Sequence, residues 1–254
     1  MFPEFLHIGN FTIYSYALCI SVGTLIASIY TKRRAKKELG IKELSNTFFY
    51  MVFLAGFIGG KLFYYLERPS YFFENPSLMA KNFSSGFVFY GSFVCIIPFV
   101  IYYLKKQKIS ILPMLDILAI ATLIVHSIGR LGCFLGGCCY GKPTELSIGI
   151  KFPKTYGTAV HPSQLYEITA LLLIMGLLFY LKKRQTFKGQ LFFVYIISYA
   201  FARICLEIFR GDNRGFIIDN LVSHSQFIGI LLIVLTLFIY NHFKNKLLTQ
   251  KTIL

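Results

Sequence analysis

Charged residues are scarce in this chain of 254 residues, and acidic residues are the scarcest of them. Only 15% of the residues are charged, with 11 Asp and Glu against 26 Lys and Arg, whereas 56% are hydrophobic. This composition excludes the water-facing surface of an ordinary soluble domain. A net charge of +15 would suggest nucleic-acid binding in a soluble protein, but beside long apolar runs it indicates charge that sets membrane topology. We therefore expect an integral membrane protein with no nucleic-acid partner.

Cysteines are also few. The chain has six, too few and too unevenly spaced for a disulfide scaffold. Cys133, Cys138 and Cys139 fall close together in the sequence, which raises the question of a zinc or iron–sulfur site. Adjacent cysteines do not easily both point at one tetrahedral metal, and no second Cys or His pair with finger-like spacing follows. The sequence therefore predicts no metal and no cofactor, and leaves open whether Cys138 and Cys139 are free, bonded or packed.

Seven apolar stretches are long enough to cross a bilayer, and in lipid such stretches must be helices. They fall at roughly 11–31, 46–66, 86–104, 111–132, 164–181, 190–209 and 225–243. Sixteen basic residues lie after the first, third and fifth stretches and in the tail, against seven in the other connections. The positive-inside rule then places the N-terminus outside and the C-terminus in the cytoplasm. We predict an all-α fold, with residues 1–254 forming a single integral-membrane domain.

The outward connections, at about 67–85, 133–163 and 210–224, are the long ones. Their content of Gly, Pro, Ser and Asn predicts turns rather than another domain. Span four ends in a stretch with five glycines between Gly129 and Gly141, which predicts a tight or re-entrant turn. We expect any chemistry to open to the outer face.

Ionisable side chains within spans are costly, so each needs a partner or a function. The candidates within or at the ends of spans are Lys61, Asp116, His126, Arg130, Arg203 and Glu207, with Glu167 near the start of span five. His126 and Arg130 are four residues apart, as are Tyr199, Arg203 and Glu207, so each set lines one face of its helix. Arg203 and Glu207 can simply pair and hold the bundle together. Alternatively, Arg130 and Arg203 offer planar donors from two helices to a phosphate.

Three further patterns have ordinary structural interpretations. Ser163 and Glu167 after Pro162 are typical of a helix start with a capping box. Tyr90 opens span three, where tyrosine is typical of the membrane interface. The Gly56 to Gly60 spacing is typical of helix packing.

These residues together resemble a family, the bacterial prolipoprotein diacylglyceryl transferases. The resemblance rests on Gly129-Arg130 through Gly141, on His161-Pro162-Ser163-Gln164-Leu165-Tyr166-Glu167, on Gly86-Phe-Val-Phe-Tyr90-Gly91, on Tyr199-Ala-Phe-Ala-Arg203 with Glu207-Ile-Phe-Arg210, and on Tyr16. It implies a seven-span enzyme of the bacterial cytoplasmic membrane whose active site faces outward. The implied reaction transfers diacylglyceryl from phosphatidylglycerol to the lipobox cysteine of a prolipoprotein, leaving a thioether and glycerol 1-phosphate, with membrane lipids as surroundings and no cofactor.

The resemblance also implies roles for individual residues. Arg130, Gly141, Tyr199, Arg203 and Tyr16 match family positions, whereas many members have His in place of Tyr90 and Asn in place of Cys133. The identity of the proton acceptor is therefore open. Tyr90, His161 or His126 can take the proton, or the field of two arginines alone can generate the thiolate. The predicted catalytic residues are Arg130, Arg203, Tyr199, Tyr90 and His161, and the predicted substrate-binding residues are Arg130, Tyr16, Gly141, Cys133, Glu207 and Arg210.

Other functions compete with this interpretation. The chain can be a divergent family member with a different acceptor. It can be a transporter or channel for an anionic solute or lipid, but a transporter should show inverted repeats and this sequence shows a single glycine-rich break. A non-catalytic lipid-binding or assembly protein is the third alternative, and Arg130→Ala would leave its cellular role intact.

Overall fold

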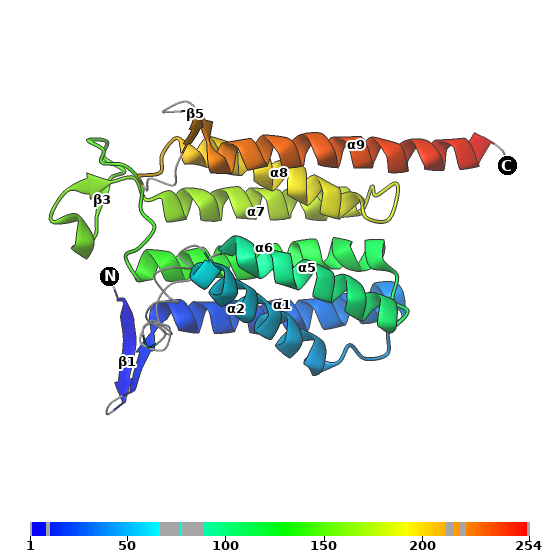
Figure 1. Ribbon diagram of the computed structural model, residues 1–254, viewed down its shortest axis with the longest axis horizontal. Helices are drawn as coiled ribbons and strands as arrows, with labels where there is room; N and C mark the ends of the chain where they lie inside the picture. Colours follow the sequence, from blue (N-terminus) through cyan, green and yellow to red (C-terminus); the bar gives the residue numbers. More distant parts are fainter. Residues whose placement is uncertain are drawn as a thin grey trace. The chain divides into compact units, whose positions relative to one another are not determined.

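The computed structural model describes residues 2–8, 11–66, 77, 89–211, 216–218 and 222–252. Within these ranges, seven α-helices follow one another along the chain (Figure 1). They are α1 (Ser15–Leu39), α2 (Asn46–Leu66), α5 (Phe89–Lys106), α6 (Ile111–Leu135), α7 (Ser163–Lys182), α8 (Gln190–Glu207) and α9 (His224–Thr252). Each contains most of one predicted span, so the prediction of a mostly helical chain is confirmed.

Within the described residues, three short antiparallel hairpins accompany the helices, and the sequence did not predict them. They are β1 (Glu4–Ile8) with β2 (Phe11–Tyr14), β3 (Ile150–Lys151) with β4 (Ala159–Val160), and β5 (Phe216–Ile218) with β6 (Val222–Ser223). The 3-10 turn η1 (Pro153–Thr155) lies between β3 and β4. The first span was predicted to begin at residue 11, but residues 11–14 pair with β1 and the helix begins at Ser15.

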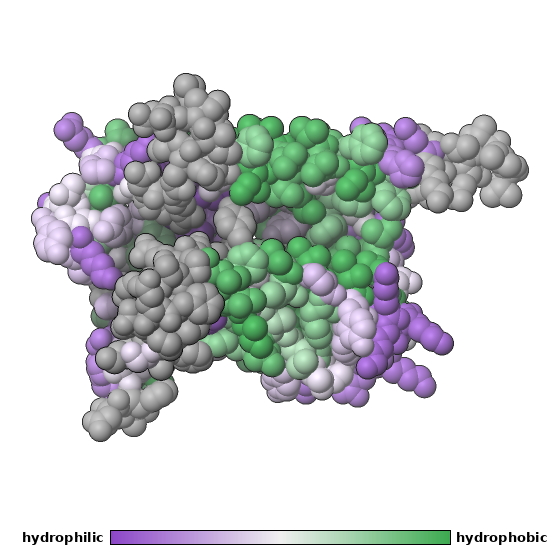
Figure 2. Space-filling view, viewed as in Figure 1, coloured by the Kyte–Doolittle hydropathy of each residue, from purple (hydrophilic) through white to green (hydrophobic). Residues whose placement is uncertain are grey.

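Five helices, α2, α6, α7, α8 and α9, are long and apolar enough to cross a membrane. Helix α9 illustrates the kind of surface they present, since Val234 is 58% and Phe238 75% exposed. Side chains this apolar are suited to contact with lipid rather than water. In Figure 2 hydrophobic side chains gather along the middle of the helices and hydrophilic ones near helix ends. The other two predicted spans correspond to α1 and α5, which are helices outside this set of five. The last third of α1 is strongly basic.

The chain divides into two compact units, one made of Met1–Arg34 with Leu115–Leu254 and the other of Ala35–Met114. The core of the first unit lies between α6, α7 and α8. Ile120, Leu123, Leu171, Leu178 and Leu191 are completely buried there. This apolar packing fixes the three helices whose polar residues form the candidate site.

Close contact between α6 and α1 depends on glycine. A Cβ atom at Gly132 would lie 2.9 Å from the Cβ of Cys19 and 3.1 Å from the Cα of Tyr16. The helix continues through Gly132 to Leu135, past the predicted end at residue 132, because this glycine serves helix packing rather than termination. The predicted tight turn follows at once, where Gly137 has φ +65°.

The opposite end of α6 carries the buried Asp116. Its carboxylate accepts hydrogen bonds from the Gln185 side chain at 2.6 Å, the Gly189 backbone at 2.7 Å and the Phe192 backbone at 3.0 Å. These donors lie in or beside the connection between α7 and α8. Asp116 therefore anchors this connection, which gives a structural reason for an acid within a predicted span.

The second unit is built on the packing of α2 against α5. A Cβ atom at Gly59 would lie 2.4 Å from the carbonyl oxygen of Gly91, so the two backbones touch. The Ser92 hydroxyl donates a 2.8 Å hydrogen bond to the carbonyl of Gly56. The small-residue pattern of α2 thus serves helix packing, as predicted.

Candidate active site on helices α6, α7 and α8

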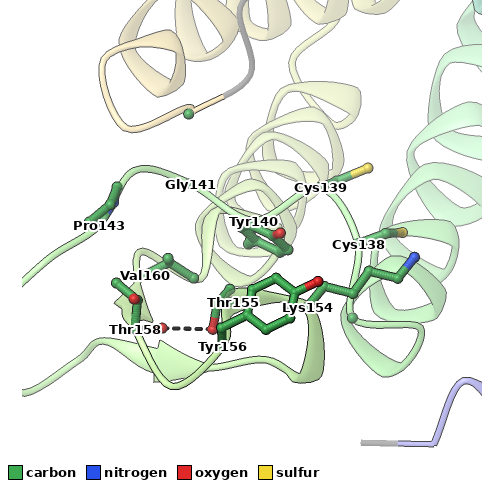
Figure 3. Close-up of a pocket in the computed structure, with 12 residues that line it drawn as sticks. Cys138, Cys139, Tyr140, Gly141, Pro143, Lys154, Thr155, Tyr156, Thr158 and Val160 are labelled. Carbon is green, nitrogen blue, oxygen red and sulfur yellow. Dashed lines mark hydrogen bonds between the residues drawn. The ribbon is translucent and has the colours of Figure 1, made fainter.

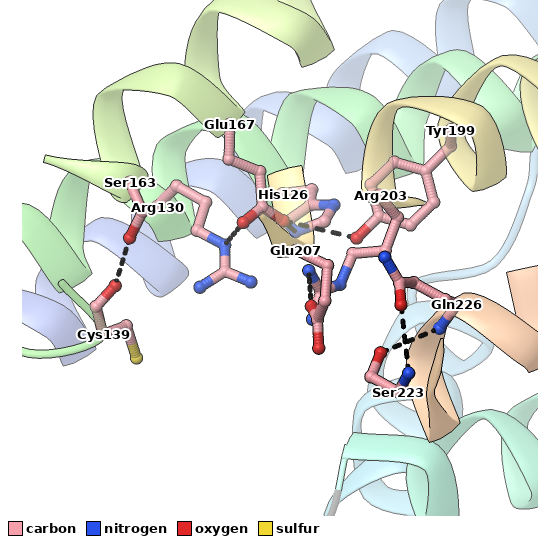
Figure 4. A network of polar contacts seen from close by, with 10 residues as sticks. All are labelled: His126, Arg130, Cys139, Ser163, Glu167, Tyr199, Arg203, Glu207, Ser223 and Gln226. Atoms are coloured by element: carbon pink, nitrogen blue, oxygen red, sulfur yellow. Dashed lines mark hydrogen bonds and ion pairs between the residues drawn. The ribbon is translucent and has the colours of Figure 1, made fainter. Parts of the chain in front are cut away.

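Glu167 is the centre of a buried polar network that joins three helices (Figure 4). Its carboxylate lies 3.0 Å from Nε of Arg130 and 3.1 Å from Nε2 of His126, both on α6. It also accepts a 3.3 Å hydrogen bond from the Tyr199 hydroxyl on α8. Only 3% of the Glu167 side chain is exposed. A carboxylate buried this deeply is tolerated only with paired charges and hydrogen bonds, and the network supplies both.

The helical spacing predicted from the sequence brings these residues together. His126 and Arg130 are one turn apart on α6 and reach the same carboxylate. The ring of His126 also packs edge-to-face against Tyr199, with the ring centroids 5.3 Å apart. The face of α6 that carries the two basic residues is therefore turned towards α7 and α8.

The first turn of α7 holds the loop that follows α6. Pro162 is the N-cap and makes no side-chain cap hydrogen bond. Instead, Ser163 Oγ donates to the carbonyl of Cys139 at 2.7 Å, and Gln164 Nε2 donates to the carbonyl of Cys138 at 2.6 Å. The capping-box interpretation of Ser163 and Glu167 was therefore wrong, because both side chains have partners on other segments.

Arg203 and Glu207 form an ion pair one helical turn apart on α8. The Nη1 atom of Arg203 lies 2.5 Å from Oε2 of Glu207, and both side chains are about nine-tenths buried. Within the described residues, neither Nη1 nor Nη2 of Arg203 makes a hydrogen bond of good geometry. The predicted pairing is confirmed, and the guanidinium retains donors for a further acceptor.

Arg130, like Arg203, is paired with a buried carboxylate. Its Nε contacts Glu167, and Figure 4 shows the two terminal nitrogens pointing away from that carboxylate. A guanidinium held through Nε presents its remaining donors in one plane, which suits the oxygen atoms of a phosphate. The site can therefore bind an anion beside the loop that follows α6.

Gly141 lies where three segments of backbone meet. Its N–H donates a 2.8 Å hydrogen bond to the carbonyl of His161, and it forms an isolated antiparallel bridge with Arg210, whose side chain is buried. A Cβ atom at Gly141 would lie 2.3 Å from the carbonyl oxygen of Phe209. The position therefore accepts no side chain, and the end of α8 is held against the loop before α7.

A pocket of about 640 Å³ opens beside this loop (Figure 3). It lies against the turn at residues 137–143 and the β3–β4 hairpin. Lys154 extends into the region of the two adjacent cysteines in Figure 3. The lining residues are Gly137, Cys138, Cys139, Tyr140, Gly141, Pro143, Lys154, Thr155, Tyr156, Thr158, Val160 and Gly211.

The cysteine side chains at this turn are free thiols, with Cys133 buried and Cys139 exposed. Side-chain hydrogen bonds from Cys133 and Cys138 lower the pKa of the Cys139 thiol, and the charges of Arg130 and Arg210 lower it further. The structure therefore answers the question that the sequence left open about Cys138 and Cys139, because neither is in a disulfide bond.

Not every predicted site residue joins the Glu167 network. Tyr16 lies near the start of α1, against Gly132 of α6. His161 hydrogen-bonds the Tyr166 hydroxyl at 3.1 Å and packs against Phe209, next to Gly141. The side chain of Tyr90 lies outside the described part of the chain, so the prediction for it stays a prediction.

The sequence reasoning did not select Glu167 as a site residue, although it is the hub of the network, and it named His126 only as an alternative base. The same feature of the sequence could have identified both Glu167 and His126. Each is an ionisable residue within or at the end of an apolar span, and each needs a partner of opposite charge. A capping box was one alternative for Glu167, and it gives the carboxylate no partner on another helix.

Comparison with known proteins shows similarity along nearly the whole chain. Residues 3–241 match the family described as prolipoprotein diacylglyceryl transferase. A phosphatidylglycerol–prolipoprotein diacylglyceryl transferase of Clostridium tetani is 34% identical over 246 residues, covering 95% of this chain and 97% of the relative. Similar proteins of the same name occur in Clostridium perfringens, 32% identical and covering 92% of each chain, and in Rickettsia canadensis, 32% identical and covering 92% of this chain and 93% of the relative. The resemblance seen in the sequence motifs is therefore confirmed.

Proposed function

Because the chain belongs to the prolipoprotein diacylglyceryl transferase family, we propose that it transfers the diacylglyceryl group of phosphatidylglycerol to the lipobox cysteine of a prolipoprotein. The thiol sulfur forms a bond to the terminal glyceryl carbon, and the bond from that carbon to the phosphate oxygen breaks. The products are a thioether on the prolipoprotein and glycerol 1-phosphate. The reaction takes place in the bacterial cytoplasmic membrane at its outer face, with the N-terminus outside and the C-terminus inside.

The orientation of Arg130 carries this proposal. The leaving phosphate gains negative charge as the carbon–oxygen bond breaks, and donors fixed in advance stabilise such charge most effectively. Glu167 holds Arg130 through Nε, so its terminal nitrogens are directed without further ordering of the side chain. Arg203, whose terminal nitrogens lack well-directed partners among the described residues, supplies a second set of donors.

The remaining site residues position these groups or the substrate. The Tyr199 hydroxyl donates a hydrogen bond to the Glu167 carboxylate and so helps to orient it. Glu207 holds Arg203, and Gly141 keeps the backbone of Arg210 against the loop before α7. Tyr16, which lies against Gly132 at the end of α6, and the neighbouring Cys133 are assigned to binding of the lipid substrate in this proposal. Their common effect is to keep two guanidinium groups at fixed positions in a bundle of low dielectric constant.

The acceptor thiol must lose its proton near neutral pH. Tyr90, His126 and His161 are the side chains proposed to accept it. His126 contacts Glu167, whereas His161 is hydrogen-bonded to Tyr166. Separate substitution of each residue distinguishes them, because the true acceptor alone changes the pH profile of turnover.

Release of glycerol phosphate tests the proposal. Detergent-purified protein is mixed with phosphatidylglycerol and a lipobox peptide, or with the same peptide carrying Ser in place of Cys, and free glycerol phosphate is assayed. We expect release only with the cysteine peptide. Equal release with both peptides would indicate lipid hydrolysis instead of transfer to a thiol, and no release with either would contradict the proposed reaction.

A further inference from the structure

Three thiols gather at the end of α6 and at the turn that follows it. The sulfur atoms of Cys133, Cys138 and Cys139 all lie within 4.8 Å of one another. Cys133 belongs to the last turn of the helix, and the other two line the pocket beside the β3–β4 hairpin. The cluster thus spans the boundary between the protein interior and an open cavity.

The backbone brings these three side chains to one side. The Cys138 N–H donates a 3.1 Å hydrogen bond back to the carbonyl of Cys133, and Cys139 has φ +63°, in the left-handed region. A non-glycine residue there requires support from its surroundings, and such residues gather at functional sites. Ser163 and Gln164 supply support by binding the carbonyl groups of the two adjacent cysteines.

This geometry removes the sequence-based argument against a metal. Adjacent cysteines in an extended chain point to opposite sides, but the left-handed turn at Cys139 directs both side chains towards the same side (Figure 3). Zinc binds thiolate sulfur at about 2.3 Å, which places the sulfur atoms of a tetrahedral site about 3.8 Å apart. The observed spacing therefore needs a contraction of at most about 1 Å, which side-chain rotation supplies.

The chemistry of the site points to a thiophilic cation. Three thiolates select soft or borderline cations, of which Zn²⁺ is the common divalent one. Three thiolates and Zn²⁺ leave a net negative charge, and Arg130, Arg210 and Lys154 are the cations that offset it, the first two beside Cys139 and the third beside Cys138. These cations balance the charge of the loaded site.

We propose that Cys133, Cys138 and Cys139 hold one zinc-type cation whose fourth position faces the pocket and accepts an external thiol. The cavity of about 640 Å³ borders two of the three ligands, so the open position is accessible. A catalytic zinc site has this form, with three protein ligands and one exchangeable position.

The identity of the external thiol rests on the proposed function. A lipobox cysteine that binds the metal transfers its proton to the acceptor side chain proposed above and becomes a thiolate next to Arg130. Its sulfur then forms the bond to the glyceryl carbon while the phosphate oxygen leaves with the electron pair of the carbon–oxygen bond. The metal is neither oxidised nor reduced, and it lowers the energy of the thiolate that attacks the glyceryl carbon.

Metal binding is tested without reference to activity. The reduced full-length protein in detergent is dialysed against Zn²⁺, washed, and analysed for zinc content. We expect one zinc per chain, and at least a tenfold weaker affinity in Cys133→Ser, Cys138→Ser and Cys139→Ser. The matched control Cys205→Ser, at an exposed cysteine of α8, should keep the metal. Equal zinc retention in all four variants would overturn the site.

The unaltered protein provides a second test that does not depend on the folding of variants. Zinc should protect Cys133, Cys138 and Cys139 from alkylation, measured by peptide mass spectrometry, while Cys205 continues to react. Alkylation of Cys139 at the same rate with and without zinc would contradict the proposal.

The open position is tested with Co²⁺ as a spectroscopic probe. The sulfur-to-cobalt absorption of the loaded protein should increase on addition of the cysteine peptide and stay unchanged with its serine counterpart. Identical spectra with both peptides would contradict the proposal that the peptide thiol binds the metal. A chelator that removes the metal should abolish transfer; undiminished transfer by metal-free protein would disprove thiol activation by zinc while leaving the transferase function established.

Discussion

Arg130 of α6 and Glu167 of α7 are joined by a 3.0 Å ion pair that uses the Nε atom of the guanidinium. The carboxylate thereby orients the side chain and leaves its terminal nitrogens directed elsewhere (Figure 4). In the proposed function, this one arginine combines a structural ion pair with a phosphate-binding group. We therefore expect substitution of Arg130 to lower turnover and substitution of Glu167 to lower stability.

Arg130→Lys should abolish most of the activity although it keeps the positive charge. Lysine is a point cation, and it cannot both contact Glu167 and present a planar pair of donors to phosphate. We expect turnover to fall by at least about 100-fold, the magnitude typical of losing a preorganised donor to developing negative charge. Steady-state kinetics with phosphatidylglycerol and a lipobox peptide measures this. Turnover near the wild-type rate would remove the role of the planar donors.

Glu167→Gln should lower stability more than any exposed acid-to-amide change. The neutral amide leaves Arg130 buried without its counter-charge, and breaking a buried ion pair costs about 3–5 kcal/mol. Glu145→Gln is the matched control, because Glu145 is exposed in the loop between α6 and α7 and such surface changes stay within about 0.5 kcal/mol. Unfolding in detergent, followed by denaturant titration, compares the two variants. Equal stabilities would show that the Glu167 network does not hold the helices together.

Gly141→Ala should displace the backbone that carries Arg210. The added methyl group would lie 2.3 Å from the carbonyl oxygen of Phe209, and backbone cannot rotate away as a side chain can. We expect turnover to drop by at least about tenfold, since small displacements of site residues have effects of this size or larger. Gly176→Ala, on α7 with no neighbouring atom within 4 Å of its Cβ position, is the control and should keep activity. Activity retained in both variants would contradict the steric role of Gly141.

Asp116→Asn should affect stability without changing the chemistry. Asp116 accepts three hydrogen bonds at the end of α6 remote from Arg130, and the amide loses one acceptor oxygen and the charge. Hydrogen bonds to charged groups are worth about 1.5–3 kcal/mol, so the unfolding free energy should fall by that order. Turnover measured well below the unfolding temperature should match that of the unaltered protein. A large loss of turnover at full stability would place Asp116 in the reaction instead.

The positions of the helices were predictable because each depends on local sequence. A run of about 20 apolar residues has few alternatives to a helix in lipid, and the same holds for the i, i+4 faces that carry His126 with Arg130 and Arg203 with Glu207. The hairpins were not predictable in this way. The pairing of β3 with β4 depends on residues 150–151 and 159–160 meeting across a turn that has no strong periodic signal.

The site was predictable in its parts but not in its connections. Sequence spacing placed Arg130 and Arg203 on separate helices, yet it could not show that Glu167 reaches Arg130, because that contact depends on how α6 packs against α7. Gln164 and Ser163 were interpretable as a helix start, whereas their hydrogen bonds join segments more than 20 residues apart. The cluster of three thiols depends on the backbone of Cys139, whose positive φ is uncommon for a residue other than glycine.

The most direct test of the central claim weighs the acceptor peptide. Purified protein, phosphatidylglycerol of defined acyl chains and a lipobox peptide are incubated, and the peptide is analysed by intact and fragment mass spectrometry. The account predicts a mass gain of one diacylglyceryl group located on the cysteine, absent with Arg130→Ala. An unmodified peptide, under conditions in which the Clostridium tetani relative modifies it, would contradict the transferase function.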